Sequence, residues 1–210
     1  MCGRFFVDEE TAREIEKVIH NVDLQIQRMR TGDIFPSQPA GILTQCGKRR
    51  EQPAAIASGS ISPALELKEM QWGFPQYQKK GLLINARAET ALERKTFRDS
   101  VLHRRCVIPA KHFYEWDSDK NKVTFFRKDA AVVYMAGFYN RFGDEERFII
   151  LTTQANASVS PVHHRMPLVL ETGELKEWVY DDQFAQYALH KTPPVLGREQ
   201  EYEQQSLFLI

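Results

Sequence analysis

The sequence predicts a single α+β domain over residues 1–210, built on a curled, mostly antiparallel β-sheet that a few helices flank. The 210 residues are 42% hydrophobic and 11% aromatic, which suffices for one folded core. From Cys106 onward, short apolar segments follow one another with short turns between them. Consecutive strands joined by short turns pair antiparallel, and this sets the predicted architecture.

The first half of the chain is expected to supply one helix, one loop and several strands. The helix covers residues 9–20 and is capped by Asp8. Its buried stripe consists of Ala12, Ile15, Val18 and Ile19. The loop covers residues 32–39, because Pro36 and Pro39 break regular structure there. The strand candidates are residues 2–6, 42–44, 54–57 and 67–72.

The second half is expected to be mainly β-structure between two helices, over residues 94–104 and 175–187. In the first of these helices, the side chains that should face the core are Phe97, Val101 and Leu102. Its basic side chains form a face that we interpret as solvated: Arg94, Lys95, Arg98, Arg104 and Arg105. The predicted strands are residues 106–108, 112–116, 123–127, 131–138, 147–153 and 207–210.

Charge and cysteine content exclude several classes of protein. Lys+Arg and Asp+Glu balance at 28 each, so a nucleic-acid site would have to be a local cluster. The three cysteines, Cys2, Cys46 and Cys106, are far apart and form no CxxC pair, which is typical of a reduced, intracellular protein. The sequence has neither a signal-peptide pattern nor an apolar stretch of membrane-spanning length. We therefore expect a cytoplasmic protein with no membrane partner.

The first four residues, Met1-Cys2-Gly3-Arg4, hold the most distinctive chemistry of the sequence. Removal of Met1 would leave Cys2 with a free α-amine beside its thiol. Such a 1,2-aminothiol condenses with an aldehyde to an imine, which the sulfur then closes to a thiazolidine. A thiol of lowered pKa can instead attack an acyl carbon. Retention of Met1, or a cysteine without a role, is the plainer alternative.

Glu115 is a candidate general acid–base. In residues 112–116, strand alternation places Glu115 on the face of Phe113 and opposite Tyr114 and Trp116. If that face is inward, desolvation raises the pKa of the Glu115 carboxyl toward neutrality. The alternative is a glutamate on an edge strand that reaches solvent.

His163 and His164 offer imidazoles that titrate near neutral pH. Adjacent residues of an extended segment point to opposite faces, so one histidine should face inward and the other outward. No acidic or cysteine ligand lies nearby at a metal-binding spacing, so we expect no metal site.

Asn85 and Arg87 are two residues apart and share one face if the segment is extended. An amide beside a guanidinium suits an anionic group such as a phosphate, to which the guanidinium donates two parallel hydrogen bonds. A helix-capping Asn with a surface Arg is the alternative.

Five motifs together resemble one known family. In chain order they are Met1-Cys2-Gly3-Arg4-Phe5, Trp72-Gly73, Ile84-Asn85-Ala86-Arg87-Ala88-Glu89-Thr90, Phe113-Tyr114-Glu115-Trp116 and His163-His164-Arg165-Met166-Pro167. This set, spread over nearly the whole chain, resembles the SOS-response-associated peptidase (SRAP) family of abasic-site processing proteins. The resemblance implies a barrel-like, SRAP-like sheet.

The resemblance also implies a sensor of abasic sites in single-stranded DNA, which protects the lesion through a covalent DNA–protein crosslink. It makes Cys2 the nucleophile whose amine and sulfur form the thiazolidine, and Asn85 the group that orients the terminus or the sugar. Glu115 would shuttle protons, and His163 would promote opening of the sugar ring and later reversal. No cofactor is implied, and we expect a monomer.

For DNA binding, the resemblance implies that Arg4 and Arg87 are phosphate ligands and that Trp72 stacks on, or wedges beside, a base. The protein would be nucleoid-associated when bound to DNA. Two stretches depart from the family pattern. Residues 35–39 lack the family's Asn, and residues 72–77 are one residue shorter, with Tyr77 in place of a second Trp.

Two other functions are compatible with the same residues. One is a cysteine hydrolase or (auto)peptidase, in which Cys2 attacks a carbonyl, His163 is the base and Glu115 orients it. The family resemblance itself implies peptidase, hydrolase and lyase-type activity in addition to crosslinking. Because only Met1 precedes Cys2, ordinary methionine removal would suffice without self-cleavage. The other is a module that grips damaged DNA reversibly without chemistry.

Overall fold

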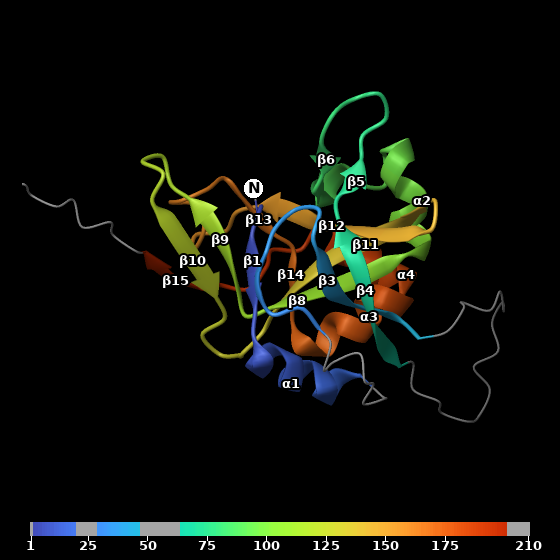
Figure 1. Cartoon of the computed structure of the whole chain (residues 1–210). Helices are drawn as coiled ribbons and strands as arrows, with labels where there is room; N and C mark the ends of the chain where they lie inside the picture. The colour runs from blue at the N-terminus through green and yellow to red at the C-terminus, as the bar shows by residue number, and fades with distance from the viewer. Residues whose placement is uncertain (1, 20–28, 47–63, 201–210) are drawn as a thin grey trace, which may run out of the picture.

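The structure, a computed structural model, describes residues 2–19, 29–46 and 64–200. Within these ranges two curled, mostly antiparallel β-sheets and flanking helices form an α+β fold (Figure 1), which confirms the predicted fold class. The strands predicted over residues 54–57 and 207–210 lie outside the described residues.

The smaller sheet has five antiparallel strands in the order β15-β10-β9-β1-β2. They are β1 (Phe5–Val7), β2 (Gly32–Ile34), β9 (His112–Trp116), β10 (Lys122–Phe126) and β15 (Gly197–Gln200). The prediction of a loop from residue 32 onward is therefore wrong for β2. Its three residues pair with β1, which the two prolines farther along do not prevent.

The larger sheet runs in the order β13-β12-β4-β3-β8-β11-β14, with β7 also paired to β12. Its strands are β3 (Pro39–Gln45), β4 (Leu65–Trp72), β7 (Asn85–Arg87), β8 (Arg105–Ala110), β11 (Val133–Phe142), β12 (Glu145–Gln154), β13 (Arg165–Pro167) and β14 (Val169–Leu170). Because β12 pairs with both β11 and β4, the strands β4, β3, β8, β11 and β12 close into a barrel-like ring. The pairs of β12 with β4 and with β7 are parallel. Beside the ring, β5 (Phe74–Pro75) and β6 (Leu82–Leu83) form a short hairpin.

Closure of the ring explains why several strands lack a polar face. Every residue of β8 is buried. Ile108 belongs to the apolar cluster that also contains Cys2 and Phe5, whereas its neighbour Val107 packs in a second cluster with residues of the helices. A strand covered on both faces has no polar alternation to reveal it in the sequence.

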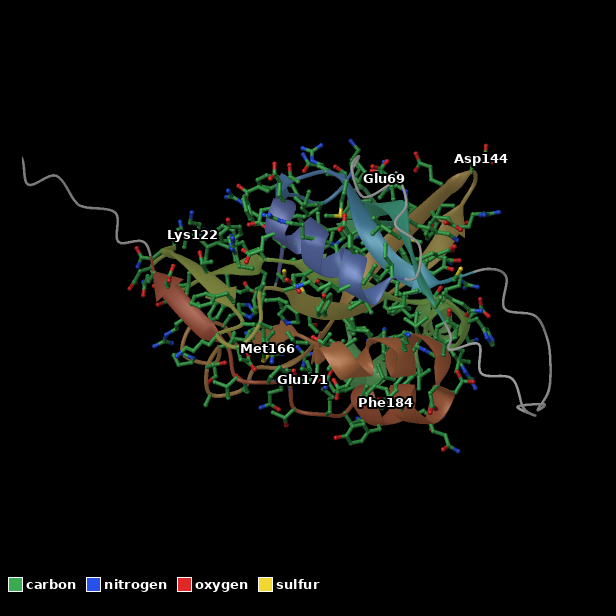
Figure 2. All side chains as sticks on the ribbon, turned by 90° about the horizontal axis from the view of Figure 1, so that it is seen from below. Glu69, Lys122, Asp144, Met166, Glu171 and Phe184 are labelled. Carbon is green, nitrogen blue, oxygen red and sulfur yellow. The ribbon has the colours of Figure 1, made fainter. Side chains whose placement is uncertain are left out.

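The helices cover the outside of the sheets (Figure 1). They are α1 (Glu9–Val18), α2 (Lys95–His103), α3 (Leu175–Tyr180) and α4 (Asp182–Ala188), with 3₁₀ turns η2 (Ala88–Thr90) and η3 (Thr172–Glu174). Asp8 caps α1 as predicted, since its Oδ1 accepts from Thr11 N at 2.9 Å. The predicted late helix is two helices, because Asp181 ends α3 and its side chain caps α4. Figure 2 shows α4, marked by Phe184, on the side of the molecule away from Lys122.

Arg105 corrects the predicted basic face. It lies in β8 rather than in the helix, and it is 3% exposed. Its guanidinium donates to the carbonyl oxygens of Trp178 at 2.6 Å and Val101 at 3.1 Å, and it pairs with Asp182 at 2.8 Å. Arg105 therefore ties β8 to the surrounding helices instead of facing solvent.

None of the helices in the described ranges is long and apolar enough to cross a membrane.

Candidate functional site

The start of the chain lies inside the protein. β1 is held between β2 and β9, and Tyr114 N donates to Arg4 O at 3.1 Å, which continues the pairing toward Cys2. Cys2 is fully buried in the apolar cluster inside the ring. In the view of Figure 1, the beginning of β1 lies between β9 and β13. The position of Cys2 is thus fixed by β-pairing on both sides of the strand that follows it.

Asn85 holds the backbone of Cys2. It begins β7, which pairs in parallel with β12 opposite Ile150. Asn85 Nδ2 donates to Cys2 O at 2.8 Å. Asn85 Oδ1 is buried and accepts no hydrogen bond from any described residue. The amide therefore does not cap a helix, and its buried oxygen keeps unused accepting capacity.

Glu115 faces inward, as strand alternation predicts. Glu115 and Phe113 are buried, with exposed fractions of 3% and 0%, while Trp116 is 39% exposed. Tyr114 is only 6% exposed, and the Arg4 guanidinium lies over its ring. β9 is an internal strand between β10 and β1, so Glu115 does not lie on a sheet edge. Burial raises the pKa of the Glu115 carboxyl, and the nearby His164 partly offsets this.

The Cys2 thiol shares its surroundings with Glu115. Burial raises the pKa of the thiol well above its ordinary value, and the negative charge of Glu115 raises it further. The Sγ atom lies 3.8 Å from Arg4 O, a weak contact in which the S–H donates. At neutral pH the thiol is therefore protonated, and it sits within electrostatic reach of a carboxyl group that can exchange protons.

His163 lies just before β13, in a segment that turns rather than extends. His163 N donates to Val159 O at 3.0 Å, and its ring stacks on that of His164 at 4.4 Å. His163 is half-buried and His164 is exposed, but the two rings lie together because the backbone is not a strand here. His163 Nδ1 is 3.0 Å from both the backbone N and the backbone O of Arg165, which fixes the ring.

Burial lowers the pKa of His163, so the imidazole is neutral at physiological pH. Val162, which precedes it, packs on the same apolar cluster as Cys2. Through His164, the histidine segment also acts on the charge of Glu115. The motifs that contain Cys2, Asn85, Glu115 and His163 therefore converge on one region.

Two residues of these motifs carry a structural link that the sequence did not reveal. Arg165 donates two hydrogen bonds to Glu89, at 2.7 and 2.9 Å, across 76 residues of chain. Burial would raise the pKa of Glu89, but the hydrogen bonds from Arg165 lower it overall. Because Arg165 also holds the ring of His163 through its backbone, this ion pair connects the segment after Asn85 to the histidine segment.

Replacing Glu89 by alanine is expected to lower the free energy of unfolding by about 2 kcal/mol. The substitution leaves Arg165, whose side chain is 11% exposed, without its carboxylate, and Glu89 itself is partly exposed, which limits the loss. Urea unfolding of both proteins measures the difference. Glu14→Ala, which breaks an exposed pair with Lys17 on α1, is the control and should cost less than about 0.5 kcal/mol. Equal effects of the two substitutions would contradict the link.

Trp72 occupies a different place from the one expected. It is fully buried, its Nε1 donates to Ile84 O at 3.0 Å, and its ring packs on Phe5 and Phe148 at 5.1 and 6.1 Å. A buried indole offers no face to a base, so base stacking by Trp72 is corrected here to a role in the core. By contrast, Tyr77 is 88% exposed.

The two arginines expected to bind phosphate differ in their surroundings. Arg4 forms an ion pair with Asp33, and its side chain is 25% exposed. Arg87 is exposed and lines a cavity of about 380 Å³. The lining of this cavity comprises Leu83, Asn85, Ala86, Arg87, Thr90, Arg94, Thr96 and Phe97. The cavity thus contains two arginines, no carboxylate and the amide that holds Cys2.

The described residues hold neither a disulfide nor a cluster of metal ligands. Cys2, Cys46 and Cys106 are all free thiols, and only Cys46 is exposed. In the part of the chain that the structure describes, no three His, Cys, Asp or Glu side chains gather as metal ligands.

Comparison with known proteins identifies the class to which this fold and site belong. The family profile of the SOS response associated peptidase (SRAP) matches residues 1–204. The chain therefore belongs to the SRAP family. Among solved structures, a phage-related protein from Bordetella bronchiseptica superposes with a TM-score of 0.73 at 21% identity, covering 96% of this chain and 95% of that one. A second Bordetella bronchiseptica protein gives 0.72 at 21% identity, covering 96% and 100%. These likenesses show the shared fold.

Curated relatives are more specific. The abasic site processing protein YoaM of Bacillus subtilis is 34% identical over 193 residues, which is 85% of this chain and 79% of that protein. The abasic site processing protein YedK of Escherichia coli is 33% identical over 189 residues, with the same coverage. The abasic site processing protein HMCES of chicken is 27% identical and is covered over 65% of its length.

Proposed function

We propose that this protein binds single-stranded DNA at an abasic site and forms a covalent crosslink to it through Cys2. The observation that carries the proposal is the convergence of Cys2, Asn85 and Glu115 at the buried start of the chain. The names of its relatives, which are abasic site processing proteins, supply the substrate class. The protein acts as a monomer in the cytoplasm, on nucleoid DNA, and shields the lesion during the response to DNA damage.

The chemistry follows from the aminothiol that removal of Met1 would create. The α-amine of Cys2 attacks the C1′ aldehyde of the ring-opened abasic sugar to give a carbinolamine. Glu115, whose pKa is raised by burial, protonates the departing hydroxyl group, so that water leaves, and the nitrogen returns a proton to Glu115 as the imine forms. The Sγ atom then adds to the imine carbon, and the thiol proton moves to the nitrogen. The products are a thiazolidine and one molecule of water.

Asn85 and His163 assist these reaction steps. Asn85 holds the carbonyl of Cys2 and so orients the amine, while its buried Oδ1 can accept a hydrogen bond from the sugar. His163, neutral because burial lowers its pKa, can take a proton from the sugar hydroxyl during ring opening. In reversal it can return that proton.

The state of the thiol favours this route over the cysteine hydrolase. A hydrolase needs a thiolate, which a nearby imidazolium or helix terminus produces by lowering the pKa. Here burial and Glu115 raise the pKa of Cys2, and the thiol contacts Arg4 O rather than an imidazole. A protonated thiol suits a reaction in which the amine attacks first and the sulfur adds second.

Incubation with an oligonucleotide that carries one abasic site tests the proposal. Mass spectrometry of the purified protein first establishes that Met1 is removed. The expected result is an adduct that survives heating in denaturant, on single-stranded DNA and not on the same oligonucleotide without the lesion. Absence of this adduct from protein that begins at Cys2 would refute the proposal.

The cavity beside Asn85 is the proposed path of the DNA backbone. Arg87 and Arg94 line it, and neither forms an ion pair with any described residue. We expect Arg87→Met and Arg94→Met each to weaken binding of intact single-stranded DNA and to reduce the slope of log K against log salt by about 1. Fluorescence anisotropy across a salt series measures both quantities. Arg141→Met, at an exposed arginine paired with Glu146, is the control and should change neither.

A further inference from the structure

We infer that Arg4 is a positioning residue that anchors the start of the chain, so that Cys2 stays in the site, rather than a ligand of DNA phosphate. The inference rests on the proposed function, and it changes the role that the family resemblance gives to Arg4. Its basis is the set of contacts that the Arg4 side chain makes on the outer face of the smaller sheet.

Arg4 and Glu115 project from opposite faces of that sheet. Tyr114 N donates to Arg4 O, so Arg4 lies opposite Tyr114 on the neighbouring strand, next to the pair of Phe5 and Phe113. Side chains alternate along strands, so Arg4 shares a face with Tyr114, while Phe5, Phe113 and Glu115 share the buried face. The guanidinium is therefore directed away from the group that carries the proton chemistry.

Two aromatic rings and a carboxylate hold the Arg4 guanidinium. Its carbon lies 4.8 Å from the ring centroid of Tyr114 and 4.9 Å from that of Phe35. Asp33, on the neighbouring strand β2, forms an ion pair with it. The hydrogen bond from Arg4 lowers the pKa of Asp33, which therefore stays ionised. These contacts join β1 to β2, to β9 and to the loop that follows β2.

The carboxylate that holds Arg4 is itself held. Tyr114 hydrogen-bonds Asp33, and the Tyr114 hydroxyl lies 2.8 Å from His112 Nε2. The His112 ring stacks on Phe6 with centroids 4.9 Å apart and an angle of 4° between the planes. Asp33, Tyr114 and His112 thus form a chain of contacts that returns to β1 itself.

This arrangement suits anchoring better than phosphate binding. Asp33 cancels the charge of Arg4, so a phosphate would have to displace a carboxylate from an arginine whose side chain is 25% exposed. Terminal residues fray unless they are tied down, and β1 contributes only three paired residues. The carbonyl oxygen of Arg4 also accepts the weak hydrogen bond of the Cys2 S–H group, so holding Arg4 in place helps to hold the sulfur atom as well.

Single-turnover crosslinking with protein in excess distinguishes the two roles, because it separates the maximal rate from the half-saturating protein concentration. Arg4→Lys keeps the charge but loses the planar group that fits two rings and a carboxylate. We expect it to lower the maximal rate about tenfold while the half-saturating concentration changes by less than about twofold. Asp33→Asn should also lower the maximal rate. Because the two residues act through one contact, the maximal rate of the double variant should lie within about twofold of that of Arg4→Lys. Arg87→Met, by contrast, should raise the half-saturating concentration.

Alkylation of Cys2 by iodoacetamide, followed by mass spectrometry, reports on anchoring without any DNA. Labelling of Cys2 should be at least about fivefold faster in Arg4→Lys and in Asp33→Asn than in the wild type, since a loosened strand exposes a buried thiol. This readout stands even if wild-type protein forms no adduct, an outcome that would refute the proposed function alone. The inference is overturned if Arg4→Lys changes only the half-saturating concentration, if Asp33→Asn tightens DNA binding, or if Cys2 labelling is unchanged.

Discussion

Cys2→Ala is expected to abolish the heat-stable adduct with abasic single-stranded DNA, with a loss of at least about 100-fold in yield. The substituted protein still exposes an α-amine after methionine removal, so an imine can form. Without sulfur the imine cannot close to a thiazolidine, and water reverses it. Cys2→Ser should behave in the same way, because an oxygen in place of the sulfur does not form the sulfur-closed ring.

The decisive measurement is a denaturing gel run with and without borohydride. Borohydride reduces an imine to a stable amine, so both variants should give adduct only when it is present, whereas wild type gives adduct in either case. Cys46→Ala is the matched control, because Cys46 is an exposed cysteine outside the site, and it should equal wild type. A heat-stable adduct from Cys2→Ala without borohydride would show that another group does the chemistry.

Local signals in the sequence account for much of the fold. Asp8 caps α1, and the run of apolar segments after Cys106 becomes β8 to β12 with the predicted turns between them. Closure of the ring was not predictable, because it depends on parallel pairing of β12 with β4, whose partners Phe148 and Trp72 are far apart in sequence. The same closure buries Trp72, whose motif context had indicated a surface role.

In the site, too, the local sequence indicates the chemistry of a residue but not its surroundings. The chemistry of Cys2 and the inward face of Glu115 follow from the terminal position and from strand alternation. Their environment does not, because it depends on partners brought together by folding. Asn85 meets Cys2 across 83 residues, and Arg4 meets Asp33 across 29. The sheet therefore decides that Arg4 lies between two aromatic rings and Asp33 and not on a DNA-binding surface, and the sequence motif alone does not reveal this.

Glu115→Gln is expected to slow crosslinking about 100-fold at saturating DNA, because an amide of the same shape cannot transfer a proton. Binding of intact single-stranded DNA should be unchanged, since Glu115 is buried on the inner face of β9. Single-turnover rates against protein concentration measure both effects. Glu177→Gln, at an exposed residue of α3, is the control. A variant that crosslinks at the wild-type rate would remove Glu115 from the proton transfers.

Glu115→Gln, which should slow crosslinking, should at the same time stabilise the fold relative to wild type, and increasingly so at higher pH. Because burial raises its pKa, Glu115 binds its proton more tightly in the folded protein than in the unfolded chain, where the pKa is near 4.5. Its contribution to the free energy of unfolding is complete below that pH and is lost as pH rises through the folded pKa. The free energy of unfolding of Glu115→Gln minus that of wild type should therefore increase with pH above about 4.5, as urea unfolding at a series of pH values can measure. A constant or falling difference would mean that Glu115 is not a desolvated acid, and an increase would show that the desolvation which makes it a proton donor also destabilises the fold.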